Sequence, residues 1–198
     1  FYLLAFRLSY VRGAITEEQC MSYTEKLLGI PELIEKILEK PETCQFAASR
    51  LVADEHLLYI GRGLDYALSM EGSLKLKEIS YIHSESYAAG ELKHGTISLI
   101  TEDMPVIAVA TQRDVLDKTV SNIKEVKSRG AFTIVVTREG TDFDKDVADI
   151  LVTVPETDDL LMPMTAVVPL QLIAYYTADL RGNDVDKPRN LAKSVTVE

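Results

Sequence analysis

Short apolar runs alternate with helical patterns along the chain after residue 53. The runs are HLLYIG (56–61), PVIAVA (105–110), AFTIVVT (131–137) and DILVTVP (149–155), and helical patterns occupy residues 64–80, 114–129 and 163–180. Continuous valine-rich and isoleucine-rich strands between helices are typical of a parallel sheet that is covered on both faces. We therefore predict that residues 53–198 form a three-layer α/β/α sandwich with a mainly parallel sheet.

The first 52 residues show helical patterns only. Residues 1–12 are predicted to be the end of an apolar helix, which Gly13 can stop in a left-handed cap conformation. Further helices are predicted at residues 16–28, 31–39 and 41–52. The apolar residues of the second of these helices lie on one side, which indicates packing and not ligand binding. Residues 1–52 are thus predicted to be a helical segment that precedes the sandwich.

Composition and charge exclude several functional classes. The 198 residues are 46% hydrophobic and 26% charged, as in an ordinary globular protein. With 31 acidic against 21 basic residues, the net charge of −10 opposes nucleic-acid binding. Cys20 and Cys44 are too few and too far apart for a disulfide scaffold or a local zinc site, so we expect a reduced, cytoplasmic protein. The apolar start FYLLAFRLSYV is too short to span a bilayer, and we expect no membrane association.

A helical face carries the first candidate chemistry. Glu71, Lys75 and Glu78 follow the spacing i, i+4, i+7, so they lie within about 60° of one another on a helix. Two carboxylates beside one ammonium could handle a proton. The same spacing also describes a solvated face with ordinary ion pairs, and the local pattern does not decide between the two.

The loop Gly61-Arg62-Gly63 follows the first predicted strand. Ligands of open parallel sheets bind beyond the carboxyl ends of the strands, so the loop would place the charged helix directly after a binding crevice. It is neither a dinucleotide fingerprint nor a Walker loop, and a tight strand-to-helix turn explains it equally well. We expect no cofactor and no metal.

Two further residues stand in polar segments. His94 lies in GELKHG, where a histidine alone is compatible with a surface position. Lys193 lies in the polar ending DVDKPRNLAKSVTVE, which has no reason of its own to be helical. Such an ending must be held in place by the protein or by a ligand.

Four segments resemble a known family. They are EGSLKLKEISYIHSESYAAGELKHG, MPVIAVA, VPLQLIAYYTADLRG and, above all, DVDKPRNLAKSVTVE, and they resemble the carboxyl-terminal part of the glucosamine-6-phosphate synthase family (glutamine-fructose-6-phosphate aminotransferase, isomerizing). That family joins a glutaminase domain to an isomerase made of two sugar-isomerase (SIS) domains of flavodoxin-like topology. The resemblance implies that residues 53–198 are the second SIS domain and that residues 1–52 end the first one and connect the two. We expect this chain to be a fragment without the glutaminase domain and most of the first SIS domain.

The resemblance also implies roles for particular residues. Glu78 matches the base that moves a proton between C1 and C2 of the sugar, and Lys75 would supply positive charge beside it. His94 matches a ring-opening histidine that reaches into the site of a neighbouring subunit. Lys193 matches the lysine that forms a Schiff base with the ketose phosphate, and Ala192 contributes backbone contacts. The implied substrate and product are fructose 6-phosphate and glucosamine 6-phosphate, and the implied assembly is a homodimer.

One departure and two alternatives remain. The serine-rich and threonine-rich loops that hold the sugar phosphate in this family belong to the first SIS domain, and no such cluster follows HLLYIG here. We therefore expect the isolated chain to be weakly active at most. The alternatives are a non-catalytic SIS module that binds sugar phosphates and a SIS isomerase of the ketose-amine deglycase type. Both would be expected to lack the RNLAKSVTVE ending. The resemblance does not settle the role of Glu71, which we interpret as a helix-face ion pair.

Overall fold

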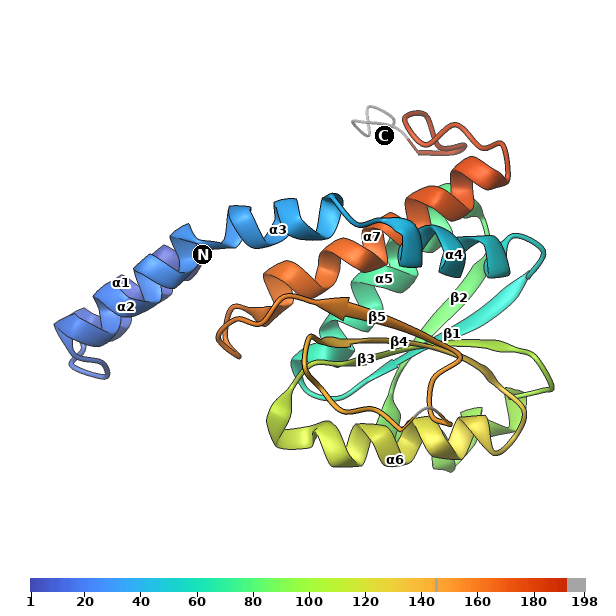
Figure 1. The fold of residues 1–198 in the computed structure, drawn as a ribbon, viewed down its shortest axis with the longest axis horizontal. Helices are drawn as coiled ribbons and strands as arrows, with labels where there is room; N and C mark the ends of the chain where they lie inside the picture. The colour runs from blue at the N-terminus through green and yellow to red at the C-terminus, as the bar shows by residue number, and fades with distance from the viewer. Residues whose placement is uncertain (145, 192–198) are drawn as a thin grey trace, which may run out of the picture.

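A parallel sheet of five strands, ordered β2-β1-β3-β4-β5, forms the centre of the computed structural model, which describes residues 1–144 and 146–191 (Figure 1). The strands are β1 His56–Gly61, β2 His83–Ala88, β3 Pro105–Ala110, β4 Phe132–Arg138 and β5 Ile150–Val154. All four strand pairings are parallel. This is the flavodoxin-like order, in which the direction of strand addition reverses between β1 and β3. The predicted α/β/α sandwich is confirmed.

Helices cover both faces of the sheet. One face carries α4 (Glu42–Leu51), α5 (Leu64–Ser80) and α7 (Met162–Leu180), and the other carries α6 (Leu116–Lys127), which follows the short turn η3 (Arg113–Val115) (Figure 1). The short helices η1 (Ala89–His94) and η2 (Thr96–Leu99) follow β2. Alternate residues of a central strand enter different cores: Leu57 and Tyr59 pack under α5 and α7, while Leu58 and Ile60 face α6. The apolar runs in the sequence are continuous because helices bury both faces of the central strands.

The edge strand β2 is not predicted by the apolar pattern because its sequence, HSESYA, is mostly polar. It lies at the edge beside β1 and needs few apolar residues. Its inward-facing Ser84 is paired with Ser73 of α5: the Ser84 hydroxyl donates to the Ser73 carbonyl at 2.9 Å, and the Ser73 hydroxyl donates to the Ser84 carbonyl at 3.1 Å. Hydrogen bonds therefore replace apolar packing between this strand and the helix.

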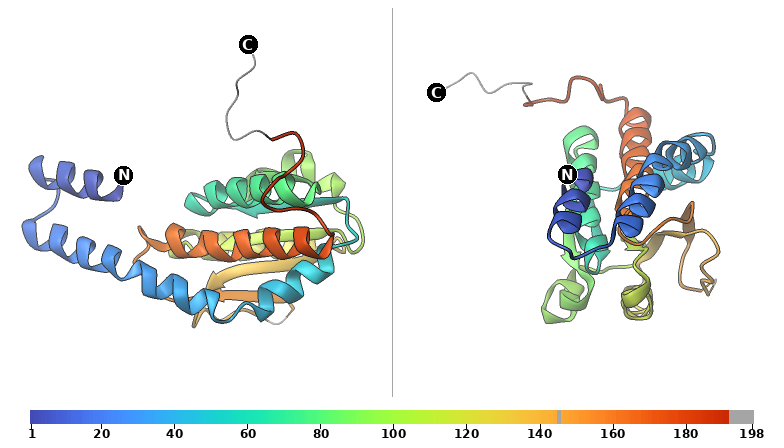
Figure 2. Two further views of the ribbon diagram at one scale, coloured as in Figure 1. Left: turned by 90° about the horizontal axis from the view of Figure 1, so that it is seen from above. Right: turned by 90° about the vertical axis from the view of Figure 1, so that its left-hand side faces the viewer.

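The amino-terminal helices α1 (Tyr2–Val11) and α2 (Glu17–Leu28) extend away from the sandwich, and α3 (Ile30–Leu38) leads from them to α7, on which it packs (Figures 1 and 2). The helices α1 and α2 form a hairpin around Gly13, which has the positive φ of 70° expected for its cap role. Thr16 and Gln19 start α2 with a reciprocal capping box. None of the described helices is both long and apolar enough to cross a membrane.

Candidate functional site

The last two turns of α5 carry a charged pair. The Lys75 ammonium lies 2.7 Å from Oε2 of Glu78 and 3.9 Å from Oε1 of Glu71. The predicted common face is therefore observed, and Glu78 is the closer partner. The side chains of Lys75 and Glu78 are 35% and 29% exposed, so a ligand can reach both. The hydrogen bond that the Lys75 ammonium donates to Glu78 raises the pKa of Lys75, so the ammonium stays charged at neutral pH.

The residues directly after this pair hold the segment that follows α7. The helix α5 ends at Tyr81 in a left-handed conformation, with φ 64° and ψ 14°. The side-chain amide of Asn183 donates to the carbonyls of Ile79 (3.0 Å) and Ser80 (3.3 Å). Carbonyls in the last turn of a helix lack partners within the helix, so Asn183 caps α5 from a distant part of the chain.

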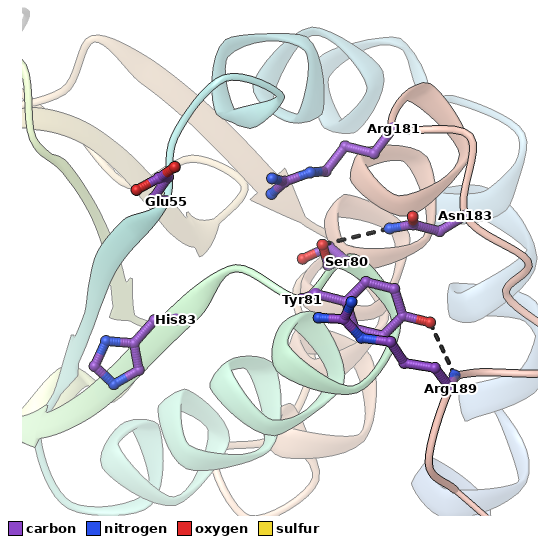
Figure 3. A pocket seen from close by; sticks show the side chains of 7 residues that line it. All are labelled: Glu55, Ser80, Tyr81, His83, Arg181, Asn183 and Arg189. Carbon is purple, nitrogen blue, oxygen red and sulfur yellow. Dashed lines mark hydrogen bonds between the residues drawn. The ribbon is translucent and has the colours of Figure 1, made fainter.

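A second contact fixes the same segment further along. The Arg189 guanidinium lies 4.0 Å from the centroid of the Tyr81 ring, and the Arg189 backbone N–H donates to the Tyr81 hydroxyl at 2.9 Å (Figure 3). Asp184 closes a turn between the two contacts by accepting hydrogen bonds from the backbone N–H groups of Asp186 and Lys187. We name residues 183–189 the anchored segment. The expectation that the protein holds the beginning of this polar ending is confirmed for these residues.

A hollow of about 420 Å³ lies beside the anchored segment (Figure 3). It is lined by Glu55, Ser80, Tyr81, His83, Arg181, Asn183 and Arg189. Arg181 is held by a bond from its Nη1 to the Asp54 carbonyl, at 3.3 Å. Because β1 and β2 begin at His56 and His83, the hollow lies at the amino edge of the sheet.

The glycine-flanked loop leads directly into α5, as expected, but the charged pair lies at the far end of that helix. Arg62 of that loop follows the carboxyl end of β1, and α5 runs from there to the amino edge. The 17 residues of α5 span about 25 Å at 1.5 Å per residue. Lys75 and Glu78 thus lie at the opposite edge from the loop, which pattern reading along the chain could not show.

His94 is not brought to the charged pair within the described part of the chain. It ends η1, after the carboxyl end of β2, and its side chain is 75% exposed. Its one described ionic contact is Glu91, at 3.8 Å. A joint role with Glu78 would need His94 from a second copy, which stays a prediction.

Ala192 and Lys193 lie outside the described residues, so their predicted roles are not tested by the structure. The last described residue is the exposed Leu191. Among the residues that the structure describes, no group of three or more histidine, cysteine, aspartate or glutamate side chains is arranged to hold a metal ion.

Two buried charged residues at the carboxyl edge were not singled out from the sequence. Asp65 is fully buried and accepts hydrogen bonds from the Thr111 backbone (2.7 Å), the Thr111 hydroxyl (2.5 Å) and the Gln112 backbone (3.0 Å). Burial raises the pKa of Asp65. Arg138 is also buried and bonds Glu156 at 2.7 Å. An arginine directly after the apolar run FTIVVT was the available signal for this buried network.

Comparison with known sequences adds a family assignment to this geometry. Residues 50–180 match the SIS domain. The chain is 51% identical over 198 residues to "Glutamine--fructose-6-phosphate aminotransferase [isomerizing]" of Clostridium tetani and 49% identical over 197 residues to that of Clostridium acetobutylicum. Each alignment covers 100% of this chain but 32% of the relative. The chain therefore spans about a third of the length of these curated relatives.

Solved structures show the same relationship. The chain is similar to the "C-terminal domain of glucosamine-fructose-6-phosphate aminotransferase" of Francisella tularensis, with a TM-score of 0.86 and 36% identity over 93% of this chain and 52% of that one. It also resembles the sugar isomerase domain of an RpiR transcription factor from Sphaerobacter thermophilus, with a TM-score of 0.67 over 80% of this chain and 90% of that one. At 16% identity, the second likeness shows the fold alone.

Proposed function

The chain belongs to the SIS domain family, and we propose that it supplies the carboxyl-terminal isomerase part of an enzyme that converts fructose 6-phosphate and glutamine to glucosamine 6-phosphate and glutamate. Similarity along the whole of this chain to about a third of the isomerizing aminotransferases supports this substrate class. The observation that carries the proposal is the Lys75–Glu78 pair, 2.7 Å apart and directly before the residues that hold the anchored segment.

Glu78 acts as the base of the isomerisation. Conversion of a ketose phosphate to a 2-amino aldose phosphate requires a proton to leave C1 and another to be added at C2, and a positioned carboxylate can do both. Only Oε2 of Glu78 is used in a described hydrogen bond, so its other oxygen can approach the sugar. The charged Lys75 ammonium stabilises the negative charge that develops on the substrate oxygen.

Lys193 provides the covalent step. Its neutral amine adds to the C2 carbonyl of the open-chain sugar, and loss of one water leaves an imine. The anchored segment supports this role because Asn183 and Arg189 attach it to Ser80 and Tyr81, the residues that follow Glu78. Ala192 contributes backbone contacts in the same stretch.

A second copy of the chain completes the site. His94 lies beyond the carboxyl edge of the sheet, whereas Glu78 lies near the amino edge, so ring opening by His94 at this pair needs a neighbouring subunit. A homodimer is therefore part of the proposal. Residues 53–198 act as the second SIS domain of a cytoplasmic enzyme, and residues 1–52 connect it to the first. Several apolar side chains are exposed on α1, as expected if another domain covers this helix in the whole enzyme. They are Leu3, Leu4, Leu8 and Val11.

Borohydride trapping tests the proposal. The full-length enzyme that contains this sequence would be incubated with fructose 6-phosphate, reduced and examined by mass spectrometry. We expect a reduced adduct on Lys193, no adduct in Lys193→Ala, and an adduct without isomerisation in Glu78→Gln. Rapid isomerisation by either variant would contradict the assignment. Sugar-phosphate binding with neither an adduct nor isomerisation would instead indicate a non-catalytic binding module.

A further inference from the structure

A second hollow lies at the carboxyl edge of the sheet, far from the Lys75–Glu78 pair. It measures about 410 Å³ and is lined by Arg62, Gly90, Lys93, Asp117, Lys118, Ser121 and Asn122. These residues come from the loop after β1, from η1 and from α6. The hollow therefore lies beside the point where the strand order reverses, between β1 and β3. Open α/β sheets bind ligands at this point.

The loop that presents Arg62 is rigidly built. A Cβ on Gly61 would lie 2.5 Å from the Asp65 carbonyl, so only glycine allows this approach, and Gly63 has a positive φ of 57°. The three hydrogen bonds that Asp65 accepts fix the start of α5 to the end of β3. Arg62 is held in advance of any ligand, which lowers the entropy cost of binding.

The Arg62 guanidinium is positioned by neighbouring groups, and none of the described carboxylates forms an ion pair with it. Its Nε donates to Oδ1 of Asn122 at 3.0 Å, and its Nη2 lies 2.9 Å from where a Cβ on Gly90 would stand. Among the described ion pairs, none involves Arg62 or Lys118. Lys93 pairs with Glu125 at 3.3 Å. The glycine thus leaves room for the guanidinium, and Asn122 orients it.

The remaining lining groups are mostly donors. Asn122 is 4% exposed, and its amide nitrogen takes part in no described hydrogen bond. Ser121 adds a hydroxyl, and the lining carries three cations against the single carboxylate of Asp117. Counting Glu125, which pairs with Lys93, one positive charge is still in excess at the hollow, on a chain whose net charge is −10. Such a local field attracts an anion.

We propose that this hollow binds a phosphate group. The two terminal nitrogens of the Arg62 guanidinium, which no described hydrogen bond uses, match two phosphate oxygens. Asn122 and Ser121 donate hydrogen bonds to a third phosphate oxygen. Lys93 and Lys118 add positive charge at the rim of the hollow. The group is either inorganic phosphate or the phosphate of a small ester. The proposed isomerisation uses none of these groups, so the phosphate site can be tested independently of that function.

Titration of the chain with inorganic phosphate, followed by NMR at the Asn122 side-chain amide and the Arg62 Nε–H, tests the site. Loss of a charged hydrogen-bond partner predicts that Arg62→Gln weakens phosphate binding at least about tenfold. The control is Arg12→Gln, which removes the positive charge of an exposed arginine between α1 and α2 and should bind phosphate as the wild type does. Equal affinities of the two variants, or no shift at Asn122 in the wild type, would overturn the proposal.

Gly90→Ala tests the geometry without a change of charge. The new methyl group would displace the guanidinium, so we expect a several-fold loss of phosphate affinity with the fold retained; wild-type affinity in this variant would count against the assigned geometry. Repeating the titration with fructose 6-phosphate in Lys193→Ala distinguishes a phosphate ester from inorganic phosphate as the ligand. Tighter binding of the ester at Asn122 identifies a phosphorylated metabolite, and tighter binding of inorganic phosphate identifies the free ion.

Discussion

Arg189 and Tyr81, 108 residues apart in the chain, meet twice: the guanidinium lies over the ring at 4.0 Å, and the backbone N–H donates to the hydroxyl at 2.9 Å. Tyr81 also ends α5, three residues after Glu78. One aromatic side chain therefore connects the proposed catalytic helix to the segment that leads to Lys193.

Tyr81→Phe removes the hydroxyl acceptor and keeps the ring. We expect hydrogen exchange at the Arg189 amide to accelerate and borohydride trapping at Lys193 to slow several-fold, because a net hydrogen bond is worth about 1 kcal/mol. Tyr10→Phe is the matched control, since Arg7 also lies over that ring, at 5.6 Å. Unchanged exchange at Arg189 in Tyr81→Phe would rule out the role of the hydroxyl.

Glu78→Gln and Glu71→Gln separate the two carboxylates that flank Lys75. Loss of a general base costs about 10²-fold to 10⁴-fold in rate, so Glu78→Gln should reduce sugar isomerisation by this amount in the full-length enzyme. Glu71 lies 3.9 Å from the ammonium, and its glutamine variant should stay within a few-fold of the wild type. Equal losses in both variants would indicate a general charge effect and not a base.

The Lys75–Glu78 pair makes stability depend on pH in a defined direction. The hydrogen bond to Glu78 raises the folded-state pKa of Lys75 above its ordinary value of 10.5. The contribution of a cation with a raised pKa is complete below the unfolded-state pKa and is lost as the pH rises through the folded-state value. We expect an exposed pair of this kind to contribute below about 1 kcal/mol, constant between pH 7 and 9 and declining above about pH 10.5.

Urea unfolding across this alkaline range measures the effect. The decline in the free energy of unfolding above about pH 10.5 should be smaller in Glu78→Gln than in the wild type. An identical decline in both proteins would show that other groups cause it.

Asp65→Ala should destabilise the fold. The substitution leaves the buried backbone N–H of Thr111 and the partly buried backbone N–H of Gln112 without their acceptor, and an unsatisfied buried group costs about 1 to 3 kcal/mol. We expect a loss of about 2 to 5 kcal/mol in the free energy of unfolding, measured in urea. Asp117→Ala, which removes an exposed carboxylate of α6, should change it by less than about 0.5 kcal/mol. Similar losses in the two variants would refute the structural role of Asp65.

Local patterns were sufficient for the parts of the fold that local physics determines. The run PVIAVA is buried at every position, so its apolar continuity predicted a central strand. The 3.6-residue period placed Glu71, Lys75 and Glu78 on one face. The apolar pattern does not reveal the strand HSESYA, because Ser84 and Ser73 form a hydrogen bond where apolar side chains would otherwise pack.

Long-range contacts set the limit for the site. Which edge of the sheet Glu78 reaches depends on where α5 runs, and no spacing within the helix reveals it. The contact between Tyr81 and Arg189 joins residues 108 positions apart, and no spacing pattern in either segment predicts it. The separation of His94 from the charged pair follows from the sheet topology, which residue patterns around His94 do not encode.

The helix α5 is held at both ends: Asp65 joins its first turn to β3, and Asn183 caps its last turn. The number of residues in α5 therefore cannot change freely, because each residue adds a fixed rise along the helix axis and a fixed rotation about it. Deletion of one residue between Asp65 and Glu78 would shorten the helix by about 1.5 Å and turn Glu78 by about 100° relative to the fixed end. Natural variation in this helix should then occur by substitution, while insertions and deletions collect in the loops around it.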